Sequence, residues 1–320
     1  EDTGRLKKIF ARYELFKKTI SIPGDIVECG VFKGTGHIYW LKLLKIFDEH
    51  SIKKVIGFDL VEKSQNYNFV KIDIRSENLE DHIPENTDVL IHLASLSSDP
   101  LCKGKSYETF DINVMGTLNL INAAIKKNVK QFIFASTEWV YEGFSENEEK
   151  DENSIIDITQ HKSEYALSKL VSEINLKQEF DNGLSNVTIL RFGIIYGPRE
   201  KNWAAVESIA SMVKNNDEVS VGSLKTGRRF VHVFDIVEGI ILSIGKNGFN
   251  IINLTGDKII TLNDIIKRTE KLFNKSITII EKNPTNISLR NPSNQKAKKL
   301  LNWNPKINLE DGLKSIESFI

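Results

Sequence analysis

The sequence feature that most constrains the fold is the alternation of short apolar runs with helical segments up to about residue 193. The apolar runs have the length and composition of strands, and they occupy residues 26–29, 54–60, 68–74, 88–95, 130–137 and 186–193. Helical segments follow the first, fourth and fifth of them, at residues 37–47, 107–127 and 163–180. Parallel strands joined by helices are buried on both faces of their sheet. The alternation therefore predicts an α/β fold with a Rossmann-like, doubly wound parallel sheet.

The pattern changes beyond about residue 194, where the segments become shorter and more mixed. We therefore predict two domains, a Rossmann-like cofactor-binding domain at residues 1–193 and a smaller C-terminal α/β lobe at residues 194–320. The first domain is expected to carry an extra amphipathic helix at residues 4–20, where apolar residues recur at helical spacing. Doubly wound folds bind ligands at the carboxyl ends of their strands, so the lobe is expected to hold the substrate there.

Charge and cysteine content exclude several classes of function. Lys plus Arg equals Asp plus Glu, at 43 each in 320 residues, so no electrostatic argument favours a nucleic-acid or membrane-surface partner. No apolar run approaches the length of a membrane span. The two cysteines, Cys29 and Cys102, lack metal-site spacing and are too few for a disulfide framework. We therefore expect a cytoplasmic protein with reduced thiols and no bound metal.

The chemistry is expected to centre on Tyr165 and Lys169, which open the helix at residues 163–180. Residues four apart share one face of a helix, so the phenol and the ammonium are expected to lie side by side. A nearby ammonium favours the phenolate and lowers the tyrosine pKa from about 10 toward neutrality. The pair could then remove a proton from a hydroxyl group that Thr137, at the end of the preceding strand, also hydrogen-bonds. Tyr-x-x-x-Lys alone is a weak motif, and its position after a Ser-Thr strand end strengthens it.

Several ordered stretches carry a specific resemblance. They are DVLIHLAS (88–95), NVMGT (113–117), FIFASTEWVYE (132–142), YALSK (165–169), LRFGIIYGP (190–198), TGRRFVHVFDI (226–236) and SLRNPSNQKAKKLLNWNPKINLEDGL (288–313). From about residue 54 to residue 320 the chain resembles the extended short-chain dehydrogenase/reductases of the NAD-dependent epimerase/dehydratase family. Enzymes of this family act on nucleotide sugars.

The resemblance implies roles for individual residues. The candidate catalytic residues are Thr137, Glu138, Tyr165 and Lys169, and the candidate substrate-binding residues are Thr137, Arg228 and Arg290. Two arginines suit a diphosphate because guanidinium groups donate paired, charge-assisted hydrogen bonds to phosphate oxygens. The candidate NAD-binding residues are Gly30, Gly34, Gly36, Asp59, Asp73, Ile74, Leu93, Ala94, Ser95, Asn113, Tyr165 and Lys169. Asp59 ends a strand where a carboxylate would accept hydrogen bonds from a ribose diol and repel a 2′-phosphate, which favours NAD over NADP.

The opening loop, GDIVECGVFKGTG at residues 24–36, departs from that family. Its glycines are spaced four and two apart, and Phe32 and Lys33 stand where small residues normally let the backbone approach a pyrophosphate. The first 60 residues resemble the start of macrocin-type sugar O-methyltransferases, in which an E-x-G loop holds S-adenosylmethionine. The loop could still present backbone N–H groups to a pyrophosphate at a helix N-terminus.

Two further departures bear on the reaction. Ile194 stands where the family often has an asparagine, so one substrate contact is absent. Glu138 and Trp139 stand where the resembling 4,6-dehydratases have an Asp-Glu pair that removes water across C5 and C6. Only one carboxylate is present, which argues against a standard dehydratase.

The predicted function is therefore that of an NAD-dependent nucleoside-diphosphate-sugar epimerase that oxidises and reduces C4 through a 4-keto intermediate. A 4,6-dehydratase or a ketoreductase of the same family is the alternative enzyme. Two alternatives of other classes stay open: a catalytically impaired sugar-nucleotide binding protein, and an S-adenosylmethionine-dependent methyltransferase. The resemblance also implies a homodimer formed through helices that flank the Tyr165 helix.

Overall fold

The computed structural model describes residues 25–29, 54–60, 68–145, 148–199 and 203–320. The predicted helix at residues 4–20 and the glycines of the opening loop, Gly30, Gly34 and Gly36, lie outside the described residues. The chain forms two compact units by its internal contacts. Unit 1 comprises Glu1–Val140, Ile158–Leu190 and Ile240–Ile251, and unit 2 comprises Tyr141–Asp157, Arg191–Gly239 and Ile252–Ile320.

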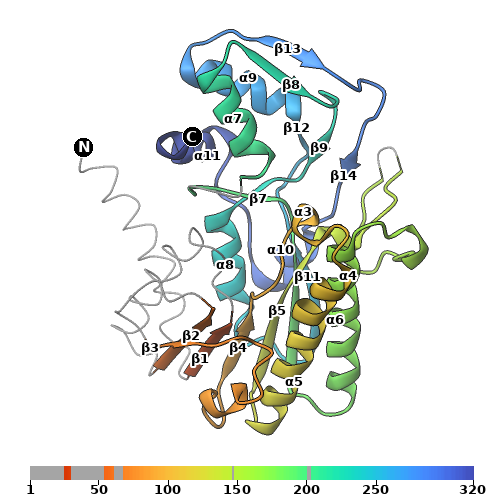
Figure 1. Ribbon diagram of the computed structural model, residues 1–320, viewed down its shortest axis with the longest axis vertical. Coiled ribbons are helices and arrows are strands. Elements are labelled where there is room, and N and C mark those ends of the chain that lie inside the picture. Colours follow the sequence, from red (N-terminus) through yellow and green to blue (C-terminus); the bar gives the residue numbers. More distant parts are fainter. Residues whose placement is uncertain (1–24, 30–53, 61–67, 146–147, 200–202) are drawn as a thin grey trace. The chain divides into compact units, whose positions relative to one another are not determined.

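A seven-stranded sheet forms the framework of the chain (Figure 1). Its strands are β1 (Asp25–Cys29), β2 (Lys54–Asp59), β3 (Asn68–Lys71), β4 (Val89–His92), β5 (Gln131–Thr137), β6 (Asn186–Phe192) and β11 (Phe249–Leu254). Their order is β11-β6-β5-β4-β1-β2-β3, and β1 pairs in parallel with both β2 and β4. The chain builds outward from β1 on one side and then, from β4, on the other, which confirms the predicted doubly wound topology.

The strand register aligns the carboxyl ends at one edge of this sheet. Cys29 of β1 lies opposite Phe58 of β2 and opposite His92 of β4. His92 in turn lies opposite Phe134 of β5, so β5 continues three residues further, to Thr137. The point between β1 and β4, where the strand order reverses, is where doubly wound folds form their ligand crevice.

Helices in the described part of unit 1 pack on the sheet or on one another. They are α3 (Asp99–Cys102), α4 (Ser106–Phe110), α5 (Gly116–Lys126) and α6 (Glu164–Asp181), with short 3-10 turns at Leu79–His82, Glu138–Val140 and Ile158–Gln160. Helices α5 and α6 lie side by side (Figure 1). Leu120, Ile121 and Ala124 of α5 are fully buried with strand residues such as Leu90 and Phe134. Each large apolar side chain buried in this way stabilises the fold by about 1.5–3 kcal/mol.

The helix predicted at residues 107–127 contains an irregular turn that the sequence did not indicate. Residues Asp111–Met115 form a π-helical turn between α4 and α5. Such turns are rare inside helices, and they often occur at functional sites because they change which side chains share a face.

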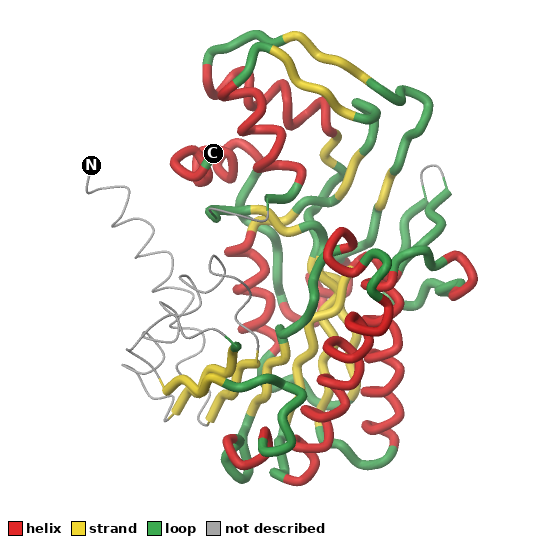
Figure 2. Tube along the Cα trace, in the orientation of Figure 1, coloured by secondary structure: helices red, strands yellow, loops and turns green. Residues whose placement is uncertain are grey.

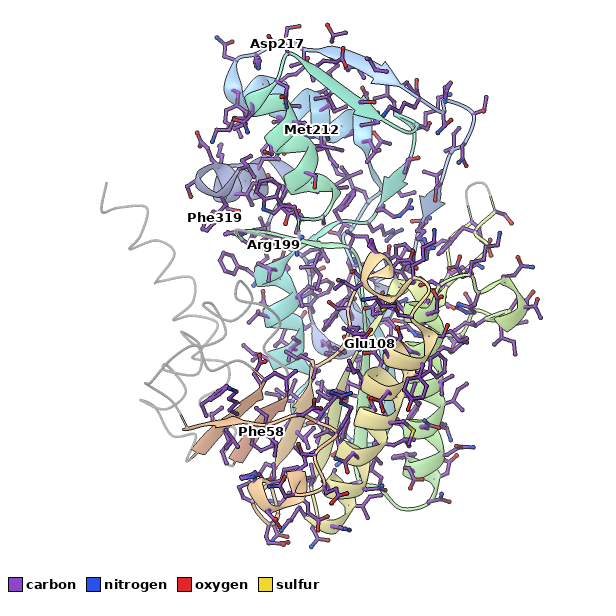
Figure 3. The ribbon with its side chains drawn as sticks, viewed as in Figure 1. Phe58, Glu108, Arg199, Met212, Asp217 and Phe319 are labelled. Atoms are coloured by element: carbon purple, nitrogen blue, oxygen red, sulfur yellow. The ribbon has the colours of Figure 1, made fainter. Side chains whose placement is uncertain are left out.

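Unit 2 has a core of its own, in which helices pack around short strands (Figure 2). Its helices are α7 (Ala205–Asn215), α9 (Leu262–Phe273), α10 (Gln295–Leu301) and α11 (Leu309–Ile316), and α8 (Val233–Ser243) begins in this unit. Its strands are β7 (Ile195–Tyr196), β8 (Glu218–Val221), β9 (Gly227–Arg228), β10 (Val231–His232), β12 (Ile260–Thr261), β13 (Thr278–Glu281) and β14 (Leu289–Arg290), and a 3-10 turn follows at Glu317–Phe319. Figure 3 labels one side chain from each core, Phe58 on β2 and Met212 on α7.

The two units are discontinuous in sequence, and the chain passes between them after Val140, Asp157, Leu190, Gly239 and Ile251. Residues 141–157 belong to unit 2 because Lys150 pairs with Pro292 and its N–H donates to the Asn291 carbonyl. Residues 240–251 belong to unit 1, where the Gln131 side chain donates to the Ser243 carbonyl and accepts from the Gly245 N–H. No helix among the described residues is long and apolar enough to cross a membrane.

Candidate functional site

The predicted catalytic residues meet where the end of β5 faces the first turns of α6. Helix α6 begins after Ser163, whose hydroxyl accepts the Ala166 N–H at 3.2 Å and caps the helix. Tyr165 therefore lies in the first turn and Lys169 one turn later, on the same face. Tyr165 is 9 % exposed, Lys169 is 2 % exposed and Thr137 is 5 % exposed. The structure thus brings together three of the four predicted catalytic side chains in a largely desolvated place.

Lys169 is held by the main chain of β5. Its Nζ donates to the Ala135 carbonyl oxygen at 2.8 Å and lies 4.7 Å from the centroid of the Phe134 ring. Both contacts favour the ammonium, but burial disfavours it and lowers the pKa of Lys169 to about 7. The lysine is therefore poised between its charged and neutral forms near neutral pH.

Tyr165 shows the opposite shift from the one predicted. Burial raises its pKa to about 12, against a smaller lowering by a hydrogen bond with the Thr137 side chain. The prediction that Lys169 draws this pKa toward neutrality is wrong for the described structure. The reason is that desolvation of the phenolate outweighs the other effects, and the Lys169 ammonium is directed at the Ala135 carbonyl.

Glu138 follows Thr137 in the 3-10 turn and is fully buried. The Glu138 carboxylate therefore does not face solvent. The next residue, Trp139, donates its N–H to Thr137 Oγ1 at 3.2 Å. The turn therefore fixes the Thr137 hydroxyl, and it places an indole where the dehydratase pattern has a second carboxylate.

Asn113 lies in the π-helical turn and supports the loop that follows β4. Its Oδ1 accepts the Leu96 N–H at 2.8 Å, and its Nδ2 donates to the Leu96 carbonyl at 3.1 Å and to Ser168 Oγ at 3.0 Å. Both amide hydrogens are used within the protein, so Asn113 ties the loop after β4 to helix α6. Leu93, Ala94 and Ser95, at the start of the same loop, are half-buried.

The predicted adenosine-side residues follow β2 and β3. Asp59 ends β2. Asp73 accepts two hydrogen bonds from the Arg75 guanidinium, at 3.0 and 2.6 Å, and this cation lowers its pKa. Arg75 also donates to Asp111 in the π-helical turn at 2.5 Å. The carboxylate of Asp73 is therefore fixed by an ion-pair cluster that the sequence did not indicate.

Ile74 is a core residue whose side chain packs against α5. It lies in the apolar cluster of unit 1, and a Cβ on Gly116 would come within 2.5 Å of its Cδ1. Its carbonyl oxygen accepts the Asn119 Nδ2 at 2.8 Å. The glycine and the asparagine thus hold the loop after β3 close to α5.

The two predicted substrate arginines become neighbours through strand pairing in unit 2. Arg228 of β9 and Arg290 of β14 are register partners in a parallel pair. Arg228 donates to the carbonyls of Gly227 and Ser288, at 2.7 and 2.6 Å. Arg290 forms an ion pair with Glu142 at 3.3 Å. The two guanidinium groups therefore come from adjacent positions on neighbouring strands, and both have acceptors within the protein.

One buried acid on α6 was not predicted from the sequence. Glu173 is buried and accepts a hydrogen bond from Ser136 Oγ at 2.5 Å. Its signal was its spacing, since Glu173 follows Lys169 by four residues on the same helix face. Among the described residues, no group of three or more His, Cys, Asp or Glu side chains could hold a metal ion.

The chain matches a family model described as "NAD dependent epimerase/dehydratase family" over residues 42–254. That match covers more than half of the sequence. The chain belongs to this family. Membership confirms the predicted resemblance, and it makes the chain one of a family of NAD-dependent enzymes. The match begins after Gly36, so the loop that departs from the family's glycine spacing precedes it.

Relatives and solved structures agree with this assignment. A UDP-glucuronate 4-epimerase of Thermodesulfobacterium geofontis is 29 % identical over 262 residues, which cover 79 % of each chain. A dTDP-D-glucose 4,6-dehydratase of Mus musculus is 28 % identical over 271 residues, covering 79 % of this chain and 74 % of the relative. A UDP-glucose 4-epimerase of Thermotoga maritima, solved with UDP-glucose, has a TM-score of 0.80 at 23 % identity over 92 % of this chain and 98 % of that one. At that identity the structural likeness shows the fold, and it confirms the Rossmann-like architecture of the family.

Proposed function

We propose that the chain epimerises a nucleoside-diphosphate sugar at C4 with NAD, through a 4-keto intermediate. The observation that carries the proposal is the burial of Thr137, Tyr165 and Lys169 together at the carboxyl end of β5. Family membership supports the use of NAD. Relatives named as 4-epimerases of UDP-sugars support both the reaction and the substrate class.

The described residues fit a dinucleotide along the carboxyl edge of the sheet. Asp59 ends β2, and residues 93–95 follow β4 beside the point where the strand order reverses. Asn113 holds the loop after β4 and Arg75 fixes Asp73 after β3, so the polar groups on this edge are pre-positioned. Bound NAD would accept a hydride from the sugar and return it. The proposed pyrophosphate contacts of Gly30, Gly34 and Gly36 stay a prediction.

The protein's own residues would move one proton. Tyr165, as the phenolate, takes the proton of the C4 hydroxyl, while Thr137 hydrogen-bonds the same oxygen. Burial opposes the phenolate, so proton transfer needs a positive charge beside Tyr165. We propose that the Lys169 ammonium turns from the Ala135 carbonyl toward Tyr165 to supply it when substrate is bound. When the 4-keto sugar receives the hydride on its opposite face, Tyr165 returns the proton to the C4 oxygen. One hydride and one proton leave and return, so no net oxidation occurs.

Arg228 and Arg290 are the proposed ligands of the substrate diphosphate. Their register pairing places two guanidinium groups on adjacent strands. Arg290 would exchange its long contacts with Glu142, at 3.3 and 3.4 Å, for shorter charge-assisted bonds to phosphate oxygens.

A 4,6-dehydratase is the second candidate, because Glu138 places a buried carboxylate beside Thr137. Trp139 cannot act as the second acid–base group of that reaction. We therefore expect no loss of water from the sugar. A product lighter than the substrate by one water would favour the dehydratase.

The test is to incubate the purified chain with UDP-glucose, UDP-galactose, UDP-glucuronate and dTDP-glucose, and to follow the products by proton NMR. Interconversion of one pair of C4 epimers without net NADH formation is expected. Net consumption of added NADH would favour the ketoreductase instead. Absence of turnover together with sugar-nucleotide binding would favour the impaired binding protein.

The ligand of the opening loop is tested separately, by thermal shift with NAD, NADP and S-adenosylmethionine. NAD is expected to stabilise the protein most strongly. Stabilisation by S-adenosylmethionine alone would favour the methyltransferase and contradict the proposal.

A homodimer is the proposed assembly. The helical layer of unit 1 exposes four large apolar side chains, namely Tyr107, Met115, Ile125 and Ile174. A two-fold interface buries the same surface of both copies, and exposed apolar side chains on these helices would favour such burial. Light scattering after size exclusion should give twice the chain mass, and a monomer at all concentrations would contradict this. A cytoplasmic location stays a prediction from the low cysteine content.

A further inference from the structure

Helix α6 carries three buried polar residues at four-residue spacing, Tyr165, Lys169 and Glu173. Positions i, i+4 and i+8 lie along one face of a helix, one turn apart. All three side chains are removed from water, since Glu173 is 4 % exposed and the other two are comparably buried. The reaction proposed above uses the first two and leaves the third without a role.

Successive residues of β5 engage this face of the helix. The Ala135 carbonyl accepts the Lys169 ammonium at 2.8 Å, and the Ser136 hydroxyl donates to Glu173 Oε1 at 2.5 Å. The Thr137 side chain hydrogen-bonds Tyr165. The Ser136 hydroxyl therefore anchors the Glu173 carboxyl group one helical turn from the Lys169 side chain.

Glu173 is the acid on this face that opposes the desolvation of Lys169. Burial lowers the pKa of Lys169, and it is raised first by Cys102 and then by Glu173. Burial also raises the pKa of the Cys102 thiol, which is therefore neutral at ordinary pH. Within the described residues, Glu173 is thus the negative charge on α6 itself that acts on the lysine.

The elements packed against α6 carry several other titratable groups. Strand β5 contains no titratable side chain, and the 3-10 turn at its end contributes Glu138, which is buried beside Thr137. The remaining titratable side chains on α3, α4, the π-helical turn and α5 are at least partly exposed, namely Asp99, Tyr107, Glu108, Asp111 and Lys126. Solvent screens those groups far more than it screens Glu173.

We propose that Glu173 is a positioning residue that keeps Lys169 in its ammonium form, with Ser136 holding the carboxylate in place. The charge of Lys169 is then available to stabilise the Tyr165 phenolate. The catalytic consequence rests on the proposed function, whereas the effect on Lys169 does not. Glutamine has the shape of a neutral glutamic acid, so Glu173→Gln removes the charge and little else.

The direct test is the titration of Lys169 in the protein labelled with ¹³C at lysine Cε, without added cofactor. Its resonance is assigned by its loss in Lys169→Met. Glu173→Gln should lower the pKa of Lys169 by about one unit or more, because opposite charges one helical turn apart in a buried site interact by more than about 1 kcal/mol. An unchanged or raised pKa in Glu173→Gln overturns the proposal.

Two further variants keep the test decisive. Ser136→Ala keeps the Glu173 carboxylate but removes the hydroxyl that holds it. The pKa of Lys169 should therefore fall as in Glu173→Gln, but by less. This variant tests the proposal if Glu173→Gln fails to fold. Asp181→Asn is the matched control, because Asp181 lies on the same helix in an exposed ion pair with Lys177. An equal shift of Lys169 in Asp181→Asn would overturn the assignment to Glu173.

The pH profile of kcat/KM connects this charge to catalysis. In Glu173→Gln the alkaline limb of this profile should move to lower pH by as much as the pKa of Lys169 falls. A fall of one pKa unit should reduce kcat/KM about tenfold at pH values above that limb. A uniform loss at all pH values would reduce Glu173 to a structural role. If the wild-type chain shows no turnover, the proposed function fails, and the titration still decides the role of Glu173.

Discussion

The β5–α6 region of unit 1 and the β9–β14 region of unit 2 both gather charged side chains, but they differ in how those side chains are assembled. In the first, Tyr165, Lys169 and Glu173 come from one continuous helix, and their spacing alone places them together. In the second, Arg228 and Arg290 are separated by about sixty residues and meet through strand register. Helical spacing is a local property, whereas strand pairing depends on the whole unit.

The two regions also differ in whether their cationic side chains can lose a proton. Lys169 is desolvated, and its pKa moves to about 7. The arginines stay charged, because a guanidinium does not lose its proton in proteins. Arg228 donates hydrogen bonds to carbonyl oxygens, and Arg290 pairs with Glu142. The first region is thus suited to moving a proton and the second to holding an anion. Substitutions in each region test that contrast.

Tyr165→Phe should lower kcat/KM by at least about a thousandfold, because it removes the general base. The loss should occur without loss of the fold, since only the hydroxyl is removed. Steady-state kinetics give the first quantity, and thermal shift with NAD checks that binding survives. A variant with nearly full activity would show that the first region does not move the proton.

Lys169→Met should change how stability depends on pH. The folded chain holds Lys169 at a pKa of about 7, against about 10.4 when unfolded. Between these values the unfolded chain binds more protons, so the free energy of unfolding of the wild type rises with pH, by up to about 4 kcal/mol from this group. Urea unfolding at several pH values should show the rise in the wild type and lose it in Lys169→Met. The same rise in both proteins would contradict the assignment.

Asp235→Asn is the corresponding experiment in unit 2. Asp235 accepts the N–H groups of Lys306 and Ile307, and burial raises its pKa to about 6. Between about pH 4 and about pH 6, the Asp235 carboxyl group therefore keeps its proton in the folded chain and has lost it in the unfolded chain. The free energy of unfolding of the wild type, measured relative to Asp235→Asn, should fall by about 2 kcal/mol over that range. A constant difference would show that Asp235 titrates normally.

Arg228→Ala and Arg290→Ala should each raise KM for the nucleotide sugar by about tenfold or more, with a smaller effect on kcat. Arg268→Ala is the matched control, because Arg268 forms a partly exposed ion pair with Glu310 in the same unit. Loss of kcat alone in the two test variants, with unchanged KM, would show that the β9–β14 region does not bind the diphosphate.

Much of the fold was readable because it depends on local periodicity. The strand-like runs at residues 130–137 and 186–193 became β5 and β6 almost unchanged, and the helix expected at residues 163–180 became α6. The π-helical turn was not readable, because Asp111–Met115 has an ordinary helical composition. Its irregularity accompanies the bonds of Asn113 to Leu96 and Ser168, which are remote in sequence.

The family motifs located the candidate site, but they did not describe its electrostatics. The spacing of Tyr165 and Lys169 correctly placed them on one face, and it wrongly suggested a lowered tyrosine pKa. That error arises because spacing contains no information on burial. The fixing of Asp73 by Arg75 and Asp111 was likewise invisible, since it joins the end of β3 to a distant helix.

By itself the sequence determined the alternation of strands and helices, the family and the candidate proton-transfer residues. Each of these depends on which residues follow one another at fixed intervals along the chain. Only the tertiary structure decided that the Ala135 carbonyl receives Lys169, that Ser136 holds Glu173, and that Arg228 lies beside Arg290. Those contacts, and the pKa shifts that follow from burial, depend on which distant segments exclude water together, and that is a property of the folded chain.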